Sequence, residues 1–426
     1  MIRPTPLWRS VAVLGVAGLV LTACGDSGTT ETEPKDSGSS SSAPPAGAKG
    51  DGTLKIGTLL PQTGSLAFLG PPEFAGVDLA LKDINDAGGV NGKTVEKVDS
   101  DSGDTSTDTA SQSVDRLLSN DVDAIIGAAS SSVTLSVLDK VAGAGVLQIS
   151  PANTSDELTN FDDKGLYFRT APPDVLQGRV LGDLILADGN STVGILALQD
   201  SYGTGLAAST EKSITDGGGE VVETVVYDPK AASFSTEVGK IKAADPEAIA
   251  VIAFDETKKI IPELIKQGIG PDTKKIYFVD GNLANYDKDF DKGALAGVKG
   301  TLPGVASTDE FKKRLLEVAP DLTEFAYAPE SYDATILVAL AAQAAGDDSG
   351  ESIASKMQEV SAGGEKCTSF TDCLALLEDG SDIDYDGISG PVEFNEKGDP
   401  SEASVGIYEY GADNKYTFVE AKAGKI

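Results

Sequence analysis

The chain has 426 residues and carries 67 acidic against 34 basic side chains, a formal net charge of -33, with three cysteines and no histidine. Without an imidazole it has neither a Ser-His-Asp triad nor a His-ligated zinc site, and the strong negative charge argues against nucleic acid as a partner. The composition, 40% hydrophobic with 48 glycines, is typical of a globular protein and sufficient for two domains of ordinary size.

The N-terminus has the features of an export signal. Two arginines precede the uncharged run from Val11 to Leu21, which is too short to span a bilayer of about 30 Å. The sequence Leu-Thr-Ala-Cys24 that follows resembles a bacterial lipobox. This resemblance implies that residues 1–23 are a lipoprotein signal peptide and that Cys24 carries a lipid at the extracytoplasmic face of the cell membrane. A short membrane anchor or a buried helix is the alternative.

Residues 24–51 contain almost only Gly, Ser, Thr, Ala, Pro and charged residues. Such a segment buries too little apolar surface to offset the entropy lost when a chain is ordered. We therefore expect a disordered tether between Cys24 and the folded part of the chain.

From Thr53 onward, short apolar runs alternate with helical patterns, which predicts βαβ units and parallel sheets. The continuous apolar run 248–254 is typical of a strand in a sheet that is covered on both faces. The chain is too long for one core, so we expect an α/β fold with two doubly wound parallel-sheet lobes. The expected strands are 54–60, 124–126, 146–149, 192–198, 248–254 and 276–279, and the expected helices are 74–84, 260–266 and two that begin at Ser131 and Tyr202.

The C-terminal part departs from this alternation, because short strands separated by turns are expected at 392–394, 405–410 and 416–419. Residues 382–393 also match the calcium-loop pattern D-x-D-x-D-G-x5-E. The context is unfavourable, since Ser389 stands at a position that is normally apolar and a strand follows where a helix is needed. We therefore expect no metal site here, with calcium binding as the alternative.

Two cysteines remain in the expected folded part, Cys367 and Cys373. An even number of cysteines at short spacing in an exported chain suggests a disulfide. A pair of reduced thiols or a soft-metal site is the alternative.

Three loops that follow expected strands carry small polar residues suited to a small zwitterion. Residues 127–132 lead into a helix whose backbone N–H groups and hydroxyls favour an anion. Residues 151–154 form a second cluster of hydroxyl and amide donors, and Asp280 at a strand end can accept from an ammonium group. Each signal is weak by itself, because Ser and Thr at helix starts usually cap the helix and an Asp at a strand end usually faces water.

Together these residues resemble the type I periplasmic binding proteins, specifically the leucine/isoleucine/valine-binding family of ABC-importer receptors. The likeness covers most of Thr53 to Val419. The likeness rests on five segments, and their occurrence together in this order is more specific than any one segment. The segments are 60–70, 83–93, 149–154, 200–205 and 388–392.

The resemblance implies a site for a zwitterion. It assigns the ligand carboxylate to Ser131, Thr154 and the backbone of Ala152, and it assigns the ligand ammonium to Thr154 and Asp280. Asp280 stands where the family often has Glu, whose side chain reaches further.

The resemblance also implies the walls of that site. Tyr202 is expected to close over the ligand, and Leu69, Phe254 and Tyr327 are expected to shape the side-chain pocket. Leu69 stands where an aromatic residue is common, and core packing is the alternative for Phe254 and Tyr327.

The family has a three-strand hinge between its lobes, which implies lobe 1 at 52–171 and 303–386 and lobe 2 at 172–302 and 387–426. Closure around a ligand would then be recognised by an ABC permease. We therefore expect a monomeric, lipid-anchored solute-binding protein for an aliphatic amino acid of branched-chain type or a similar small zwitterion or amide. Catalytic residues, a cofactor and a metal are not expected.

Two other functions remain open. The same fold serves as a ligand-sensing receptor domain, which the sequence does not distinguish from a transport receptor. An exported hydrolase is disfavoured, because the chain has no histidine and no G-x-S-x-G turn that would present a nucleophile.

Overall fold

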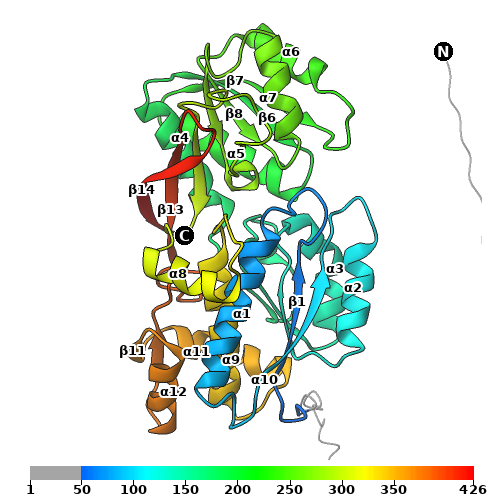
Figure 1. Ribbon diagram of the computed structural model, residues 1–426, viewed down its shortest axis with the longest axis vertical. Helices are drawn as coiled ribbons and strands as arrows, with labels where there is room; N and C mark the ends of the chain where they lie inside the picture. Colours follow the sequence, from blue (N-terminus) through cyan, green and yellow to red (C-terminus); the bar gives the residue numbers. More distant parts are fainter. Residues whose placement is uncertain (1–48) are drawn as a thin grey trace, which may run out of the picture. The chain divides into compact units, whose positions relative to one another are not determined.

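The computed structural model describes residues 49–426 (Figure 1). The expected signal peptide at 1–23, the expected lipidation site Cys24 and most of the expected tether lie outside the described residues. Within residues 49–426, no helix is both long enough and apolar enough to cross a membrane. Two large sheets organise this part of the chain into two lobes.

The first lobe is built on a five-stranded parallel sheet in the order β2-β1-β3-β4-β5. The strands are β1 (Lys55–Leu60), β2 (Glu96–Asp101), β3 (Ala124–Gly127), β4 (Leu147–Ser150) and β5 (Tyr167–Arg169). The helices are α1 (Gly70–Asp86), α2 (Thr109–Leu118), α3 (Ser131–Gly143), α8 (Asp309–Val318), α9 (Ala328–Ala345), α10 (Gly350–Ala354), α11 (Met357–Ser361) and α12 (Phe370–Glu378), and η1 (Leu158–Asn160) is a 3-10 turn.

Side-chain alternation along β1 explains why this sheet is covered on both faces. Ile56 and Leu60 belong to the core that includes α1 and α9, whereas Leu59 belongs to the core formed with α2 and α3. Figure 1 shows α1 and α9 on one side of β1 and α2 and α3 on the other.

The second lobe is built on a seven-stranded sheet in the order β14-β13-β10-β9-β8-β6-β7. Its strands are β6 (Thr192–Leu198), β7 (Glu220–Tyr227), β8 (Ala248–Ile252), β9 (Lys275–Phe278), β10 (Lys299–Pro303), β13 (Glu402–Tyr410) and β14 (Tyr416–Lys425). Its helices are α4 (Asp174–Ala187), α5 (Ser201–Asp216), α6 (Ser235–Ala244) and α7 (Thr257–Lys266), with the 3-10 turn η2 (Asp280–Asn282). Strands β6 to β10 are parallel, and the C-terminal hairpin β13–β14 adds antiparallel strands to β10.

The expected strands at 405–410 and 416–419 lie within β13 and β14, but the expected strand at 392–394 is wrong. Phe394 makes only an isolated bridge to Pro400, and Asp386 makes one to Pro391. A proline has no N–H to donate, so neither bridge extends into a ladder.

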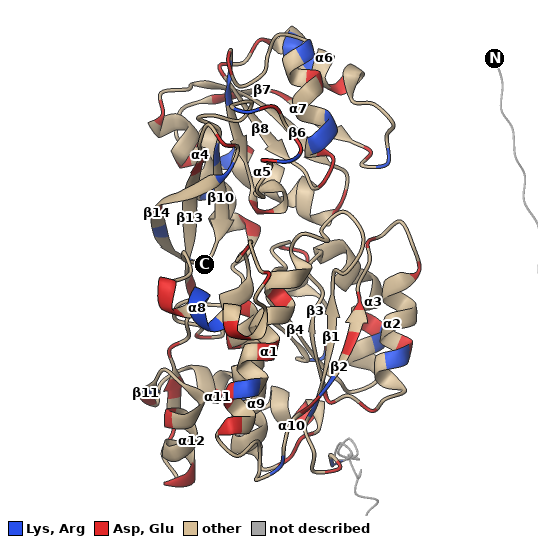
Figure 2. Ribbon diagram, viewed as in Figure 1, with Lys and Arg blue, Asp and Glu red and all other residues tan. Residues whose placement is uncertain are grey.

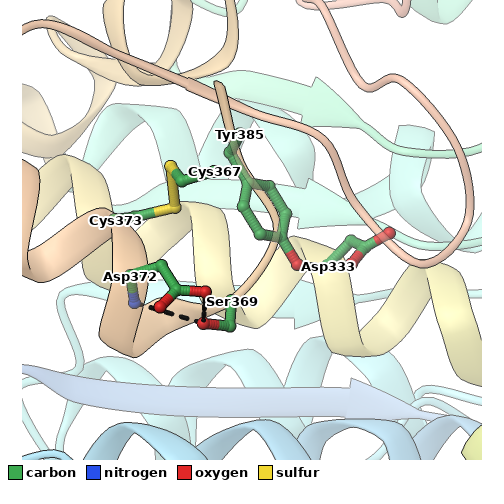
Figure 3. The surroundings of a disulfide bond; sticks show 6 residues. All are labelled: Asp333, Cys367, Ser369, Asp372, Cys373 and Tyr385. Carbon is green, nitrogen blue, oxygen red and sulfur yellow. Dashed lines mark hydrogen bonds between the residues drawn. A yellow bond between two sulfur atoms is a disulfide. The ribbon is translucent and has the colours of Figure 1, made fainter. Parts of the chain in front are cut away.

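A small parallel sheet, β11 (Glu365–Cys367) with β12 (Ile383–Tyr385), lies at the end of the first lobe beside a disulfide. The disulfide joins Cys367 to Cys373 at the start of α12, with their Cα atoms 5.3 Å apart (Figure 3). The acidic side chains of the calcium-loop pattern face a lysine, because Lys366 Nζ lies 3.3 Å from Asp384 and 2.9 Å from Asp386.

The chain enters the first lobe beside the loop that follows α9. The N–H of Gly50 donates to Asp347 Oδ1 at 3.4 Å, and the N–H of Gly52 donates to Asp348 Oδ1 at 3.0 Å. This entry point lies at the amino ends of the strands, because β1 begins immediately afterwards.

Three segments join the elements of the two sheets. The first connection (170–173) runs from β5 to α4, the second (304–308) from β10 to α8, and the third (386–401) from β12 to β13. The third connection stays with the first lobe for most of its length: the Phe394 ring lies 5.2 Å from the Phe168 ring, and Asp399 is paired with the buried Arg169 at 2.6 Å.

All three connections contact the first two turns of α9. The hydroxyl of Thr170 in the first connection donates to the carbonyl of Glu330 at 3.0 Å. Gly304 in the second has φ +92° and lies so close to the Glu330 carboxyl that an added Cβ would be 2.0 Å from Oε1. In the third, the N–H of Ser389 donates to Asp333 Oδ2 at 2.7 Å, and Asp333 also accepts from the Tyr385 hydroxyl at 2.7 Å (Figure 3). This part of α9 therefore anchors the three connections.

Candidate functional site

The carboxyl ends of strands from both sheets meet around a small cavity, which we call the interlobe cavity. Ligands of open α/β sheets bind at such strand ends. This cavity has a volume of about 10 Å³, room for about one water molecule. Seven of the eight predicted ligand-binding residues line it, together with Leu66, Ala129, Ser130 and Gly281; the seven are Leu69, Ser131, Ala152, Tyr202, Phe254, Asp280 and Tyr327.

The first lobe contributes a hydroxyl donor from the start of α3. The Oγ of Ser131 accepts from the N–H groups of Thr154 at 3.3 Å and Ser155 at 3.2 Å. Among the described residues no acceptor takes the hydroxyl hydrogen of Ser131, which leaves it for an acceptor in the cavity. The N–H of Ala152, by contrast, is already engaged, because it donates to Ser150 Oγ at 3.2 Å.

The second lobe contributes a buried carboxylate from η2. Asp280 Oδ1 accepts from the Tyr202 hydroxyl at 2.7 Å and from Gln177 Nε2 at 2.8 Å, and Oδ2 accepts from the Tyr327 hydroxyl at 2.7 Å. Burial raises the pKa of Asp280, and these three donors oppose that rise. A carboxylate has about four acceptor positions, so one remains for a further donor.

Two tyrosines approach Asp280 from different lobes. Tyr202 belongs to α5 of the second lobe, and its ring stacks on Phe254 with centroids 5.4 Å apart. Tyr327 precedes α9 of the first lobe and has a left-handed backbone with φ 60°, which is rare for a bulky residue. The hydrogen bond from Tyr327 to Asp280 therefore spans the two lobes.

Thr154 is the predicted site residue that does not line the cavity. Its side chain is buried and its hydroxyl has no partner among the described residues. The neighbouring Asp174 is also buried, and its N–H donates to the Thr154 carbonyl at 2.7 Å. Burial raises the pKa of Asp174 well above its usual range.

Two polar residues that contribute to the site environment, Asp174 and Gln177, were missed by the sequence analysis. They stand three apart and therefore share one face of α4, and both are buried. A polar pair at this spacing among Val, Leu and Gly residues is the signal that would have pointed to them. The same spacing would also fit a solvent-exposed face of the helix, so the sequence alone does not distinguish the two.

Further contacts close the edge of the interface. The Ser132 hydroxyl donates to Asp200 Oδ2 at 3.3 Å, and its oxygen lies 2.9 Å from Ser201 Oγ. Burial raises the pKa of Asp200 to about 6. Acidic and basic residues occur on both lobes (Figure 2).

Comparison with known proteins identifies the family. The family model described as "Periplasmic binding protein" matches residues 53–370, which is more than half of the chain. Leu/Ile/Val-binding protein homolog 1 of Brucella abortus (strain 2308) is 27% identical over 377 residues, covering 86% of this chain and 93% of the relative. The chemotactic signal transduction system substrate-binding protein BasB of Halobacterium salinarum is 27% identical over 358 residues, covering 80% and 83%.

A solved structure shows the same fold. It is the branched-chain amino acid transporter substrate binding protein LivJ of Streptococcus pneumoniae in complex with isoleucine. The TM-score is 0.71 at 23% identity, covering 88% of this chain and 100% of that chain. On the fold, the cavity at the strand ends and the family match, the chain belongs to the type I periplasmic binding proteins of the leucine/isoleucine/valine-binding family and is a solute-binding protein rather than an enzyme.

Proposed function

We propose that the chain binds an aliphatic amino acid of branched-chain type, or a similar small zwitterion or amide, and presents it to the permease of an ABC importer. The observation that carries this proposal is the pairing of a free hydroxyl donor from one lobe with a buried carboxylate from the other. Ser131 suits the ligand carboxylate, and Asp280 suits the ligand ammonium. The names of the Brucella and Streptococcus proteins support the same ligand class.

The walls of the interlobe cavity favour an aliphatic side chain. Leu66, Leu69, Ala129 and Phe254 are apolar and buried, and they face the space between Ser131 and Asp280. The aromatic stack of Tyr202 on Phe254 forms a flat wall for methyl groups. An amino acid whose side chain is uncharged would satisfy all of these surfaces.

Ligand entry requires the lobes to separate, because the interlobe cavity has room for about one water molecule. We propose that they move about the three connections, with the lobe division at 52–171 and 303–386 against 172–302 and 387–426. The contacts of Phe394 and Asp399 with β5 favour moving the last boundary of this division, so that most of the third connection counts with the first lobe. Such hinge closure around a ligand is a common switching motion.

We propose supporting roles for the loop after β4. Thr154 and Ser155 hold the Ser131 hydroxyl in place, since their N–H groups donate to it, and Ala152 lines the cavity beside it. The hydroxyl of Thr154 is buried without a hydrogen-bond partner among the described residues, and we propose that it becomes a second donor or acceptor when a ligand widens the cavity.

We also propose that residues 1–23 are a signal peptide and that lipidated Cys24 holds the monomeric protein at the extracytoplasmic face through the tether 24–51. The lipobox-like sequence and the composition of the tether support this proposal. Mass spectrometry of the protein from membranes of an expressing bacterium tests it, and an unmodified Cys24 in a chain that retains residues 1–23 would refute it.

The ligand class is tested by thermal shift and calorimetry with leucine, isoleucine, valine, aliphatic amides, urea and 4-methylpentanoate. At a ligand concentration a hundredfold above Kd, the expected stabilisation is about 2.7 kcal/mol. Binding by at least one zwitterion or amide is expected, and the absence of any shift across the panel would contradict the proposal.

A second candidate function, ligand sensing, is favoured by the name of the Halobacterium relative, a chemotactic signal transduction protein. Deletion of the gene separates the two functions. Loss of uptake of the radiolabelled ligand with intact chemotaxis supports transport, and the reverse result supports sensing.

A further inference from the structure

A second cavity of about 380 Å³ lies among the three connections, and we call it the hinge cavity. Thr170 of the first connection, Gly304 of the second and Ser389 of the third line it, together with Ser404 at the start of β13. It shares no lining residue with the interlobe cavity. A molecule in the hinge cavity would therefore contact both lobes without touching the proposed amino-acid site.

Most of the hinge cavity wall is apolar, with one buried ionisable side chain. Glu330 in the first turn of α9 lines the cavity and is only 2% exposed, whereas Glu402 and Lys425 lie exposed at the rim. The apolar lining residues are Pro172, Val305, Pro391, Val392, Pro400 and Ala403.

The carboxyl of Glu330 lacks the partners that a buried acid normally has. Apart from its own backbone N–H, no described residue donates a hydrogen bond to it. Burying a carboxylate without a partner is unfavourable, so buried acids are normally paired or hydrogen-bonded. The first turn of a helix favours an acidic residue, but that preference does not require the side chain to face an apolar cavity.

The backbone of the second connection leaves room for this carboxyl. Gly304 has φ +92°, and an added Cβ would lie 2.0 Å from Glu330 Oε1. A side chain at residue 304 would therefore push the carboxyl out of its position at the cavity wall.

We propose that the hinge cavity is a second binding site, which takes a compact alkylammonium with its cationic end on Glu330 and its short hydrocarbon body against the proline and valine wall. An ammonium group supplies the hydrogen-bond donors and the charge that the buried carboxyl lacks. The hydrocarbon body replaces water at the apolar wall. Neutral alcohols and anions of the same length supply only part of this match.

Protons compete with the ammonium for Glu330, because burial raises the pKa of this carboxyl to about 8. Below that pH the carboxyl is mostly protonated, so binding of the cation should strengthen as pH rises from 6 to 9. The charged and titratable groups around it are Glu73 on α1, Tyr327 before α9, Asp333 on α9, Tyr408 on β13, and Glu402 and Lys425 at the rim.

The test uses calorimetry on the full chain at pH 8.5 with n-butylammonium, n-butanol and butyrate as probes of matched length. Butylammonium should bind at least about ten times more tightly than either other probe, because only butylammonium makes a charge-assisted hydrogen bond to Glu330. Glu330→Gln should abolish this preference, and Glu409→Gln, which changes an exposed acid of β13, should retain it. Equal affinities for the three probes, or an unchanged preference in Glu330→Gln, would overturn the proposal.

Two controls separate the hinge cavity from the amino-acid site and from misfolding. If butylammonium bound instead to the interlobe cavity, Asp280→Asn would abolish its binding, and that result would overturn the proposal. Glu330→Gln should keep the melting transition of the folded protein and, where the wild type binds leucine, its leucine affinity. Because the probes differ, loss of leucine binding and loss of butylammonium binding are distinguishable failures.

Discussion

The two lobes present groups to the interlobe cavity that differ in how fully their hydrogen bonds are already made. In the first lobe, Ser131 accepts two backbone N–H groups and keeps its own hydrogen free. In the second, Asp280 already accepts from Gln177 and two tyrosines. Under the proposed function, the first lobe offers a free donor to the ligand carboxylate, whereas Asp280 of the second lobe would be shared between the ligand ammonium and its three protein donors.

The largest expected effect tests the carboxylate of the second lobe. Asp280→Asn keeps the shape of the side chain but removes its charge. Losing one member of a buried charge pair costs about 2–5 kcal/mol, so leucine affinity should fall about 30-fold or more. Calorimetry with leucine and with 4-methylpentanoate, which lacks the ammonium, provides the measurement.

The carboxylic acid without an ammonium should lose little affinity in Asp280→Asn. The matched control is Asp272→Asn, which changes an exposed acid of the same lobe and should leave both affinities unchanged. Equal losses for leucine and 4-methylpentanoate would show that Asp280 does not hold the ammonium.

The next effect tests the donor of the first lobe. Ser131→Ala removes one hydrogen bond to a charged carboxylate, worth about 1.5–3 kcal/mol, so affinity should fall about 10- to 150-fold. In contrast to Asp280→Asn, the loss should be similar for leucine and 4-methylpentanoate. Ser136→Ala, at an exposed position of the same helix, is the control. Loss confined to leucine would assign Ser131 to the ammonium instead.

A smaller effect distinguishes the two tyrosines that donate to Asp280. Tyr327→Phe removes a bond between lobes, whereas Tyr202→Phe removes a bond within the second lobe. The unliganded Tyr327→Phe protein should therefore open more readily and show a larger radius of gyration in small-angle scattering. Tyr202→Phe should not change that radius. An equal increase in the radius of gyration of both variants would contradict a role for the Tyr327 hydroxyl in holding the lobes together.

The smallest effect concerns the end of the first lobe remote from the cavity. Asp123 precedes β3 and accepts from the Lys55 N–H at 2.7 Å, and burial raises its pKa from 3.8 to about 7. Between those two values the folded state holds a proton that the unfolded chain releases. Stability from this group is therefore lost as pH rises.

Asp123→Asn removes this contribution, so the fall in melting temperature between pH 5 and pH 8 should be smaller than in the wild type. Asp200 and Glu330, with pKa values of about 6 and about 8, act with the same sign and keep part of the slope. The exposed neighbour Asp121 supplies the control Asp121→Asn. A steeper fall in Asp123→Asn would contradict the assignment, and ligand affinity should not change.

The fold was predictable where strands are covered on both faces. The run from Ala248 to Ile252 is entirely apolar and forms β8, which has a neighbouring strand on each side. Strand β7 at the edge of the same sheet was missed, because Glu220 and Glu223 interrupt its apolar pattern and several of its residues are partly exposed. Edge strands pair on one side only, so their sequences resemble loops.

The site was predictable only in part, for a similar reason. Ser131 and Asp280 follow strands, and ligands of doubly wound sheets bind at the carboxyl ends of the strands, so the position of the cleft could be predicted. Gln177 lies on a helix, where a single polar residue looks like part of a solvent-exposed face. Only the packing of α4 against η2 shows that its amide reaches Asp280. The family resemblance named the other two Asp280 partners, the tyrosines, but not the bond between lobes that one of them makes.

The entry of the chain at Gly50 and Gly52 has a practical consequence for handling the protein. These residues are held by Asp347 and Asp348 at the amino ends of the strands, and the interlobe cavity lies at the carboxyl ends. A bead, chip or dye attached upstream of residue 49 is therefore linked to the first lobe at the end that lies away from the interlobe cavity. Under the proposed hinge motion the second lobe carries no attachment, so surface-immobilised protein should bind ligand with the same affinity as protein in solution.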